Sequence, residues 1–323
     1  MPRLCAVLRV VCAAFALLWA ASPASAQYPN RPVKVLTGYA PGGAPDLLAR
    51  FVTQRLSELL GQPVIVENRP GSNGNIAGDL AAKSAPDGYT LILAPDSQIV
   101  VNPHLYPKLP YDPIKDLVPV STVATSQFFL AVNPQVPVKT FQEFVDYAKK
   151  AHPPLAYGSA GNGSAHHLMM ELFKQVAKLD MSHVPYRSGA PAATALVAGE
   201  VPVMISGASN VVQMKSGKIR PLATTGAQRS QMFPELPAIG EFYPGYEFTV
   251  WLGIFAPAGT PEPVLQRLRG DIGTALNDPH VRDKIASISL QPINWDIAQF
   301  KSAIARDNEK YGKLVKDIGA TID

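Results

Sequence analysis

Short apolar runs alternate with amphipathic helical patterns along almost the whole chain of 323 residues, and this alternation constrains the fold more than any other feature. Residues 32–39 and 63–71 are predicted to be strands, and between them residues 44–61 place Leu, Phe and Val three or four positions apart. A strand, a helix and a second strand in this order form a βαβ unit, which belongs to a mainly parallel sheet covered by helices. The chain is therefore predicted to be an α/β protein.

The same order begins again near the middle of the chain. Residues 140–143, Thr-Phe-Gln-Glu, form a capping box that predicts a helix ending at Lys150. Further strands are predicted at residues 155–159, 181–186 and 201–207, with helices at 164–179 and 189–199 between them. Two such series in one chain predict two lobes, each with a mainly parallel sheet flanked by helices.

Two apolar segments, residues 125–134 and 247–257, are predicted to cross between the lobes as hinge strands. We expect lobe 1 to comprise residues 27–128 and 250–323, and lobe 2 to comprise residues 129–249. Small ligands commonly bind in the cleft between two hinged α/β domains, so the ligand cleft is expected between the lobes.

The N-terminus carries the features of a secretory signal peptide. Arg3 and Arg9 are followed by an apolar run over residues 10–21 and by Ala-Ser-Ala at residues 24–26. A basic region, a short apolar core and an A-x-A site predict cleavage after Ala26 and a periplasmic mature protein. The apolar run is shorter than the roughly 18 residues that a transmembrane anchor needs.

Composition excludes several classes of function for the predicted mature chain. Both cysteines, Cys5 and Cys12, lie in the signal peptide, which excludes disulfides, thiolate catalysis and cysteine-ligated metals. Removing Arg3 and Arg9 with no acid lowers the formal net charge from +4 to +2. A nearly neutral chain without a basic patch argues against nucleic acid as a partner.

Residues 39–46, Tyr-Ala-Pro-Gly-Gly-Ala-Pro-Asp, connect the first strand to the first helix and are predicted to bind an anion. The first N–H groups of a helix have no partner within it, and the positive end of the helix dipole lies behind them. Glycines without a Cβ let a ligand approach the backbone. A carboxylate that accepts three such bonds at about 1.5–3 kcal/mol each reaches micromolar affinity. The alternative is an ordinary tight connection. The expected contacts are Tyr39, Ala40, Gly42, Gly43 and Asp46.

A second loop, residues 157–168, repeats this arrangement in the other lobe: a strand end, small residues and a helix predicted to be capped by Ser164. Two helix starts across a cleft suit a ligand with a carboxylate at one or both ends. Polar loops after other strands are expected to complete the rim, because ligands bind at the carboxyl ends of parallel strands. The expected contacts are Ser159, Ala160, Gly161, Asn162, Ser164, His166, Asp96, Ser97 and Ser206.

Competing chemistry has less support in the sequence. His166 and His167 are adjacent and point about 100° apart on a helix, which makes a poor metal chelate. No G-x-S-x-G motif occurs, and no convincing Asp/His partner for Ser159 or Ser164 is found. A hydrolase that uses one of these serines with His166 is the less favoured alternative, and no metal or cofactor is expected.

Several stretches together resemble one known family. They are APGGAPDLLAR, VIVENRPGSNGNIAGDLAAKSAPDGYTLIL, NPHLYPKLPYDPIKDLVPVS, YGSAGNGSAHHL, VPYRSGAPA and GYEFTVWLGIFAPAGTP. These resemble the Bug proteins, the TctC-like extracytoplasmic solute receptors of tripartite tricarboxylate transporters, over nearly all of the mature chain. The resemblance implies a two-lobed periplasmic binding protein of type II-like fold. It also implies ligand contacts from backbone N–H groups and ordered water in two loops, which here match residues 39–46 and 157–164.

The chain departs from the usual pattern of this family at several positions. Ala195, Pro202 and Ser206 stand where acids are common in the family, and Asn73 stands where Gly is frequent. His166 stands where a small hydroxyl residue is usual. The change at Ser206 removes a negative charge from a strand end, so the hypothesis is a cleft that favours an anion or a neutral end group, unless residue 206 faces away from the ligand.

Two charged residues leave alternatives open. Asp46 either orients its loop by accepting early helix N–H bonds, which is the favoured interpretation, or meets an amino group of the ligand. Arg187 stands where the family usually has Lys, and it either reaches a carboxylate bidentately or remains a solvated surface residue.

The sequence thus predicts a periplasmic, monomeric, non-enzymatic protein that captures a small organic acid by closure of its lobes. The resemblance implies delivery of that acid to the permease subunits of a tripartite transporter. A sensory receptor for the same ligands is the second alternative.

Overall fold

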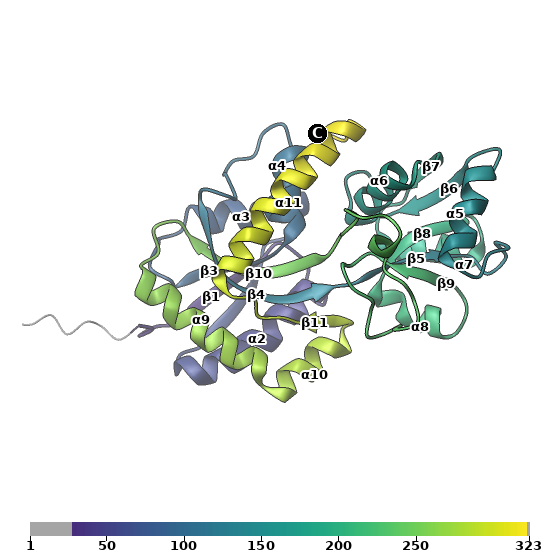
Figure 1. Ribbon diagram of the computed structural model, residues 1–323. Coiled ribbons are helices and arrows are strands. Elements are labelled where there is room, and N and C mark those ends of the chain that lie inside the picture. The colour runs from purple at the N-terminus through teal and green to yellow at the C-terminus, as the bar shows by residue number, and fades with distance from the viewer. Residues whose placement is uncertain (1–27, 322–323) are drawn as a thin grey trace, which may run out of the picture.

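The computed structural model describes residues 28–321, which form two α/β lobes joined by extended segments (Figure 1). The predicted signal peptide and its cleavage site lie outside the described residues. Within the part of the chain that the structure describes, no helix is long and apolar enough to cross a membrane.

Lobe 1 contains a six-stranded sheet with the order β11-β4-β10-β3-β1-β2. Its first part comprises β1 (Val33–Thr37), α2 (Ala44–Leu60), β2 (Val64–Asn68), α3 (Asn75–Ala82), β3 (Thr90–Pro95), α4 (Asn102–Leu105) and β4 (Leu117–Ser126). The chain returns to this lobe in β10 (Val250–Pro257), α9 (Glu262–Asn277), α10 (Pro279–Ser287), β11 (Leu290–Pro292) and α11 (Ile297–Ile318). Short turns of 3-10 helix at Ser72–Gly74 and of π-helix at Ser97–Val101 precede α3 and α4.

Lobe 2 contains a five-stranded sheet with the order β7-β6-β8-β5-β9. Its elements are β5 (Phe128–Val132), α5 (Phe141–Lys150), β6 (Leu155–Ser159), α6 (Ala165–Ala177), β7 (Met181–Pro185), α7 (Gly189–Ala198), β8 (Val203–Gly207), α8 (Val211–Lys215) and β9 (Arg220–Thr224). The predicted capping box at Thr140 is confirmed, because the Thr140 hydroxyl accepts from the Glu143 amide and the Glu143 carboxylate accepts from the Thr140 amide.

The two-lobed α/β fold is confirmed, but both sheets are mixed rather than mainly parallel. Parallel pairs join β1 to β2 and β3 in lobe 1, and β6 to β7 and β8 in lobe 2. In contrast, β10 is antiparallel to β3 and β4, and β5 is antiparallel to β8 and β9. The chain leaves lobe 1 through β4 and returns through β10, and a leaving and a returning strand side by side must run in opposite directions.

The segment predicted as one crossing strand at residues 125–134 is in fact two strands, since β4 ends at Ser126 and β5 begins at Phe128. On the return path the Phe248 amide donates to the Thr225 carbonyl at 2.9 Å before β10 begins at Val250. This connectivity supports the proposed lobe limits, residues 27–128 with 250–323 and residues 129–249, which stay a prediction.

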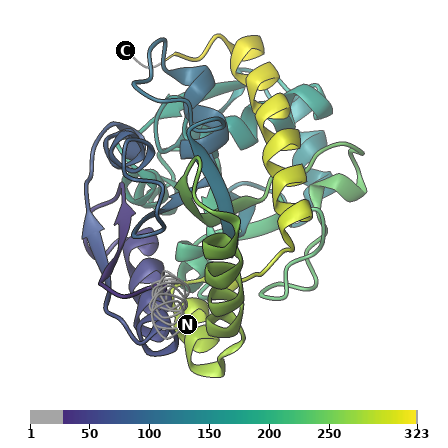
Figure 2. The ribbon, with the colours of Figure 1, turned by 90° about the vertical axis from the view of Figure 1, so that its left-hand side faces the viewer.

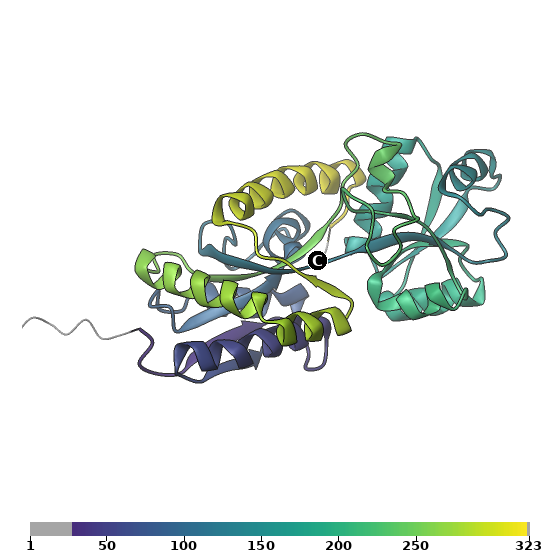
Figure 3. The ribbon, with the colours of Figure 1, turned by 60° about the horizontal axis from the view of Figure 1, so that its bottom comes forward.

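Helices cover both faces of each sheet. In lobe 1, α2, α9 and α10 bury their apolar residues on one face, and α3 and α11 lie on the other, as Figure 3 shows. The long α11 runs along the side of lobe 1 in Figure 2. In lobe 2, α6 packs on the face that carries Phe128 and Leu130, and α7 packs on the face that carries Phe129 and Ala131.

The strand directions place the carboxyl ends of the parallel strands of both lobes at the interlobe side. In lobe 1, β1, β3 and β4 run in the same direction, and β4 leads into lobe 2. In lobe 2, β5 enters from lobe 1 and is antiparallel to β8, so β8 and its parallel neighbour β6 end where β5 begins. The loops after β1 and β6 therefore lie on edges of the two sheets that face each other.

The helix α10 and the short edge strand β11 were not predicted from the sequence. An Asp-Pro start was available as a signal for α10, because the Asp278 carboxylate accepts from the His280 amide at the beginning of this helix. β11 has only three residues and pairs with β4, so its sequence carries too little periodicity to reveal it.

Candidate functional site

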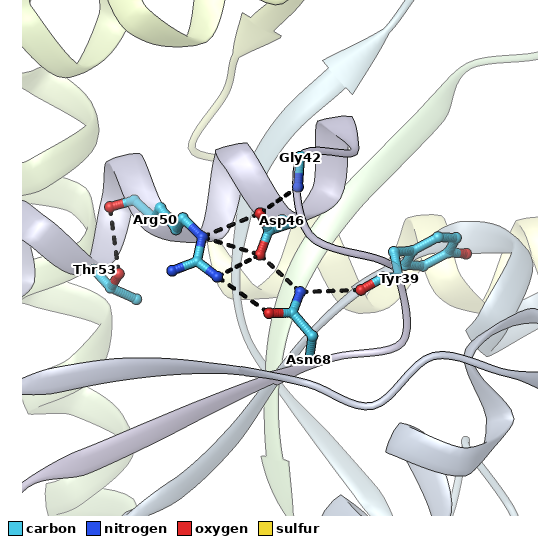
Figure 4. Close-up of polar contacts among 6 residues, drawn as sticks. All are labelled: Tyr39, Gly42, Asp46, Arg50, Thr53 and Asn68. Atoms are coloured by element: carbon cyan, nitrogen blue, oxygen red, sulfur yellow. Dashed lines mark hydrogen bonds and ion pairs between the residues drawn. The ribbon is translucent and has the colours of Figure 1, made fainter.

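The first predicted loop is held in shape by the carboxylate of Asp46. This carboxylate accepts the Gly42 amide at 2.9 Å, the Asn68 side-chain amide at 2.7 Å and the Arg50 Nε–H at 3.1 Å (Figure 4). Asn68 also donates to the Tyr39 carbonyl at 3.0 Å, so both ends of the loop are fixed to one side chain. Asp46 is only 1% exposed. Its carboxylate is fully engaged within lobe 1, in agreement with the loop-orienting interpretation.

The hydrogen bonds to Asp46 also keep its carboxyl group ionised. Burial alone would raise the pKa of Asp46, but the hydrogen bonds from Arg50, Gly42 and Asn68 outweigh burial and lower the pKa below its ordinary value. The loop is therefore tied to a carboxylate that is ionised at neutral pH. For Tyr39 burial prevails and raises the pKa to about 12, so this phenol remains a neutral hydrogen-bonding group.

Only part of the first loop keeps amides available for a ligand. Asp46 uses the Gly42 amide, and the Gly43 amide reaches the Ala40 carbonyl at 3.3 Å. Gly43 is the N-cap of α2 and makes no side-chain cap bond. Among the described residues, no hydrogen bond uses the amides of Ala40, Ala44 or Asp46. These three groups, two in the first turn of α2 and one earlier in the loop, are the donors that the first loop offers.

The second predicted loop is organised by two serines and two histidines. The Ser159 hydroxyl accepts the Gly161 amide at 3.0 Å and lies 2.6 Å from His183 Nε2. The Ser164 hydroxyl donates to the Gly161 carbonyl at 2.7 Å and caps α6 by accepting from the His167 amide, as predicted. His167 Nδ1 in turn accepts the Gly163 amide at 3.1 Å.

These bonds leave four amides of the second loop available. Among the described residues, no hydrogen bond uses the amides of Ala160, Asn162, Ala165 or His166. The last two are the first amides of α6, so they lie at the positive end of a helix dipole. The two loops thus repeat one arrangement on facing edges: a few amides shape the loop, and the helix-start amides remain for an anion.

The predicted rim residues lie deeper than expected. Asp96 is 2% exposed, and its carboxyl accepts only the adjacent Ser97 amide, at 2.7 Å. Burial, reinforced by the nearby Asp307, raises the pKa of Asp96 well above its ordinary value. Ser97 is half-buried at the start of the π-helical turn. Ser206 is fully buried, and its hydroxyl accepts from the Asn210 side chain at 3.0 Å.

Arg187 and His166 lie at the other positions singled out in lobe 2. Arg187 is exposed between β7 and α7, and no hydrogen bond of the described residues involves its side chain. His166 is half-buried and packs edge-on against Phe128, with the ring centres 5.2 Å apart. Ligand contact by each of the predicted residues stays a prediction.

The structure adds two residues that the sequence analysis did not single out. Asn68 ends β2 and ties the first loop to Asp46, and a polar residue at the carboxyl end of a parallel strand was an available signal for it. His183 lies in β7, 24 residues from its partner Ser159, and no local pattern marks this pair. Asn68 acts on the first loop through the Tyr39 carbonyl and the Asp46 carboxylate, and His183 acts on the second loop through Ser159.

The Ser159–His183 pair does not have the properties of a hydrolytic dyad. Burial lowers the pKa of His183 to about 4, which makes the imidazole a weak base at neutral pH. Ser159 is fully buried, and its hydroxyl is already bonded to the Gly161 amide. His183 instead stacks between His167, at a ring distance of 4.1 Å, and Tyr157. The pair therefore shapes the second loop.

Comparison with known proteins points to receptors for small solutes. A family model described as "Tripartite tricarboxylate transporter family receptor" matches residues 48–320. Protein BugT of Bordetella pertussis is 33% identical over 326 residues, which covers 100% of this chain and 99% of BugT.

Two solved structures with bound acids have the same fold. The structure of R. palustris Rpa4515 with adipate is 32% identical, covers 91% of this chain and 100% of that chain, and has a TM-score of 0.77. MatC from Rhodopseudomonas palustris with bound malate is 30% identical, covers 89% of this chain and 100% of that chain, and has a TM-score of 0.73.

Proposed function

Because the chain belongs to the tripartite tricarboxylate transporter receptor family, a family of solute-binding receptors and not of enzymes, we propose that it captures a small organic acid in the periplasm and delivers it to the permease subunits of such a transporter. The observation that carries the proposal is the pair of loops at residues 39–46 and 157–164, on facing edges of the two sheets. Each loop retains helix-start amides that no group of the described protein uses.

The loops suit a carboxylate better than a phosphate or a cation. Hydrogen bonds from backbone amides to a charged acceptor are among the stronger ones, and a helix start adds a favourable dipole. No arginine or lysine lies within either loop, so the loops suit the single negative charge of a carboxylate better than the larger charge of a phosphate. Asp46, the one acid there, is already bonded to Gly42, Asn68 and Arg50 and does not repel the anion from an open position.

Closure of the lobes is coupled to binding of the ligand. An acid that contacts both loops binds the closed state more tightly than the open state, and this difference in affinity shifts the population toward closure. The adipate and malate bound by two structural relatives support carboxylates as the ligand class. A permease that recognises the closed form would then receive only the loaded receptor.

A thermal-shift series with purified mature protein tests the proposal. Adipate, malate and shorter or longer diacids are added, with the corresponding diamides as uncharged controls. A bound acid at a hundred times its Kd stabilises the native state by about 2.7 kcal/mol, so we expect a clear rise in Tm with at least one acid and none with its diamide. If no acid raises Tm, or if the diamides act equally well, the proposed ligand class is wrong.

The transport step has its own test. In a strain that lacks this protein, uptake of the acid identified by thermal shift should fall to the background rate and return when the gene is restored. Uptake that is unchanged in the deletion strain would argue against delivery to a permease while leaving the binding result intact.

A further inference from the structure

His166 occupies a special position over the edge of the lobe 2 sheet. It is the second residue of α6, which covers one face of this sheet, whereas α7 covers the other face. A Cβ built on Gly189, the first residue of α7, would lie only 3.4 Å from Cε1 and Nε2 of His166. The imidazole therefore extends from the face of the sheet covered by α6 toward the start of α7 on the opposite face. To do so it must cross the edge of the sheet where β6 and β8 end.

This edge is the one that faces lobe 1. Phe128, on which the imidazole packs edge-on at 5.2 Å, is the first residue of β5, directly after the crossing from lobe 1. Gly207, the last residue of β8, lies against the same phenyl ring, since a Cβ built there would be 3.4 Å from Phe128 Cε1. His166 thus lies on the interlobe side of lobe 2, beside the second loop.

The polar atoms of His166 have no partner within the described protein. No hydrogen bond of the described residues involves its imidazole nitrogens, in contrast to His167 and His183, whose rings are engaged with Gly163 and Ser159. Two helix starts lie beside it. The first amides of α6 are unused, and α7 begins at Gly189 after Ser188, which makes no side-chain cap bond. A hydrogen-bonding side chain between two helix starts that keep unused amides is well placed to meet an anionic group.

On these grounds, and resting on the proposed function, we infer that His166 determines the ligand class as diacids: its imidazole N–H donates to the carboxylate at the lobe 2 end of the ligand, while the first loop holds the other carboxylate. Burial lowers the pKa of His166 to about 4, so at neutral pH the ring is uncharged and carries one N–H. Selectivity for a diacid then comes from a directed hydrogen bond and two helix starts, without a cationic side chain in the loop.

The test compares matched diacids and monoacids: succinate with butanoate, glutarate with pentanoate, and adipate with hexanoate. Isothermal titration at pH 7 gives Kd for the wild type and for His166→Leu, which fills a similar volume against Phe128 without a donor. His166→Gln retains an N–H donor, and Arg187→Gln removes the nearby exposed cation. Melting curves without ligand establish that each variant is folded.

We expect the wild type to bind at least one diacid about tenfold or more tightly than its monoacid, because the monoacid leaves the lobe 2 donors unused. His166→Leu should weaken diacid binding about tenfold to a hundredfold and change monoacid binding less than about threefold. His166→Gln should restore most of the diacid preference, and Arg187→Gln should keep it. A lost fold would instead weaken both ligands of a pair equally.

Different outcomes overturn different statements. If the wild type binds no acid of either kind, the proposed function fails and the inference fails with it. If the wild type binds acids but His166→Leu keeps the same ratio of diacid to monoacid affinity, only the role of His166 is refuted. A wild type that prefers monoacids refutes it as well, and so does a diacid preference that disappears in Arg187→Gln alone.

Discussion

At the scale of single residues, the chemistry of this protein is decided by what each carboxyl group contacts. Asp46 lies in the first turn of α2 and Asp96 directly follows β3, and both are buried. Asp46 has the Gly42 amide, Asn68 and Arg50 as donors, whereas Asp96 has one amide and faces a second acid, Asp307. The same residue type is therefore held ionised at one site and pushed toward its neutral form at the other.

Substitution of Asp46 by Asn is expected to destabilise the native state by about 2–3 kcal/mol, because hydrogen bonds to a charged acceptor are lost and a buried amide faces donors. The lowered pKa of Asp46 stabilises the native state above the unfolded pKa of about 4, and this contribution is lost as pH falls through the folded pKa. Urea unfolding at pH 7 and at pH 3 measures both effects.

Asp317→Asn is the matched control for this prediction. Asp317 is ion-paired with Lys313 on the partly exposed surface of α11, and such pairs contribute at most about 1 kcal/mol. Equal losses of stability in Asp46→Asn and Asp317→Asn would contradict the role given to Asp46. A loss for Asp46→Asn that is the same at both pH values would contradict its lowered pKa.

Substitution of Asp96 by Asn is expected to stabilise the native state at pH 8. The raised pKa of Asp96 gives the native state extra bound protons between the unfolded pKa of about 4 and the folded pKa, so stability falls as pH rises through this interval. Asn resembles the neutral form and retains an oxygen for the Ser97 amide. Melting curves from pH 4 to pH 8 should show a Tm advantage for Asp96→Asn that grows with pH.

Asp307→Asn serves as the contrasting variant. Its carboxylate accepts the Trp251 indole N–H at 2.9 Å and lies 3.2 Å from Lys310, so loss of its charge should lower stability. A Tm for Asp96→Asn that lies below the wild type at pH 8 would show that Asp96 is ionised and stabilising there, contrary to its placement.

At the scale of elements, the second loop depends on a contact with the opposite lobe. Gly163 has a φ of +69°, and a Cβ built there would lie 2.7 Å from Cδ1 of Leu105 at the end of α4. Leu105 is 1% exposed, so its side chain has little room to move away. The loop that begins α6 in lobe 2 therefore fits against α4 of lobe 1 only because residue 163 has no side chain.

Gly163→Ala is expected to destabilise the native state by about 2 kcal/mol or more, from backbone strain together with the overlap with Leu105. Leu105→Ala in the Gly163→Ala background should recover the part due to overlap, which gives a coupling energy of about 1 kcal/mol in a double-mutant cycle. Urea unfolding of the four proteins measures this energy, and the affinity for the acid ligand is measured on the same set.

Gly217→Ala is the control, since Gly217 has a similar φ of +73° but no neighbouring atom within 4 Å of a built Cβ. It should show the strain alone. Additive effects of Gly163→Ala and Leu105→Ala would mean that the two residues do not press on each other, and the lobe contact would then lose its role in placing the loop.

At the scale of the whole molecule, two segments join the lobes: the turn at Gln127 between β4 and β5, and the return path into β10. The sheets lie on either side of these segments (Figure 1), and the strand directions place the loops at residues 39–46 and 157–164 on their facing edges. Only two covalent connections between the two sheets favour motion of the lobes as rigid bodies around a bound ligand.

Closure is expected to change the distance between the lobes without changing distances within a lobe. The predicted mature chain has no cysteine, so pairs of introduced cysteines can be labelled selectively. Ile65→Cys and Val212→Cys place dyes on exposed sites of lobe 1 and lobe 2, and Ile65→Cys with Ile114→Cys places both on lobe 1. Energy transfer should change with a bound acid in the first pair only. A change in both pairs, or in neither, would argue against rigid-body closure.

The elements that are encoded locally could be predicted from the order of residues alone. Apolar periodicity placed β1, α2, β6 and α6 within a few residues, and the caps at Thr140 and Ser164 were visible as residue types at fixed offsets. The two glycine-rich loops were also visible, because the end of a strand and the start of a helix each have a local signature.

The groups that these loops contact are set by packing in three dimensions. Asn68 meets Asp46 from 22 residues away, His183 meets Ser159 from 24 residues away, and Leu105 meets Gly163 across the two lobes. Such partners are set by strand order and by the packing of helices on both faces of a sheet, which no window of neighbouring residues contains. Asp96 is a further example. The sequence places it as a polar residue directly after a predicted strand, but its burial beside Asp307 of α11 follows only from the packing of that helix.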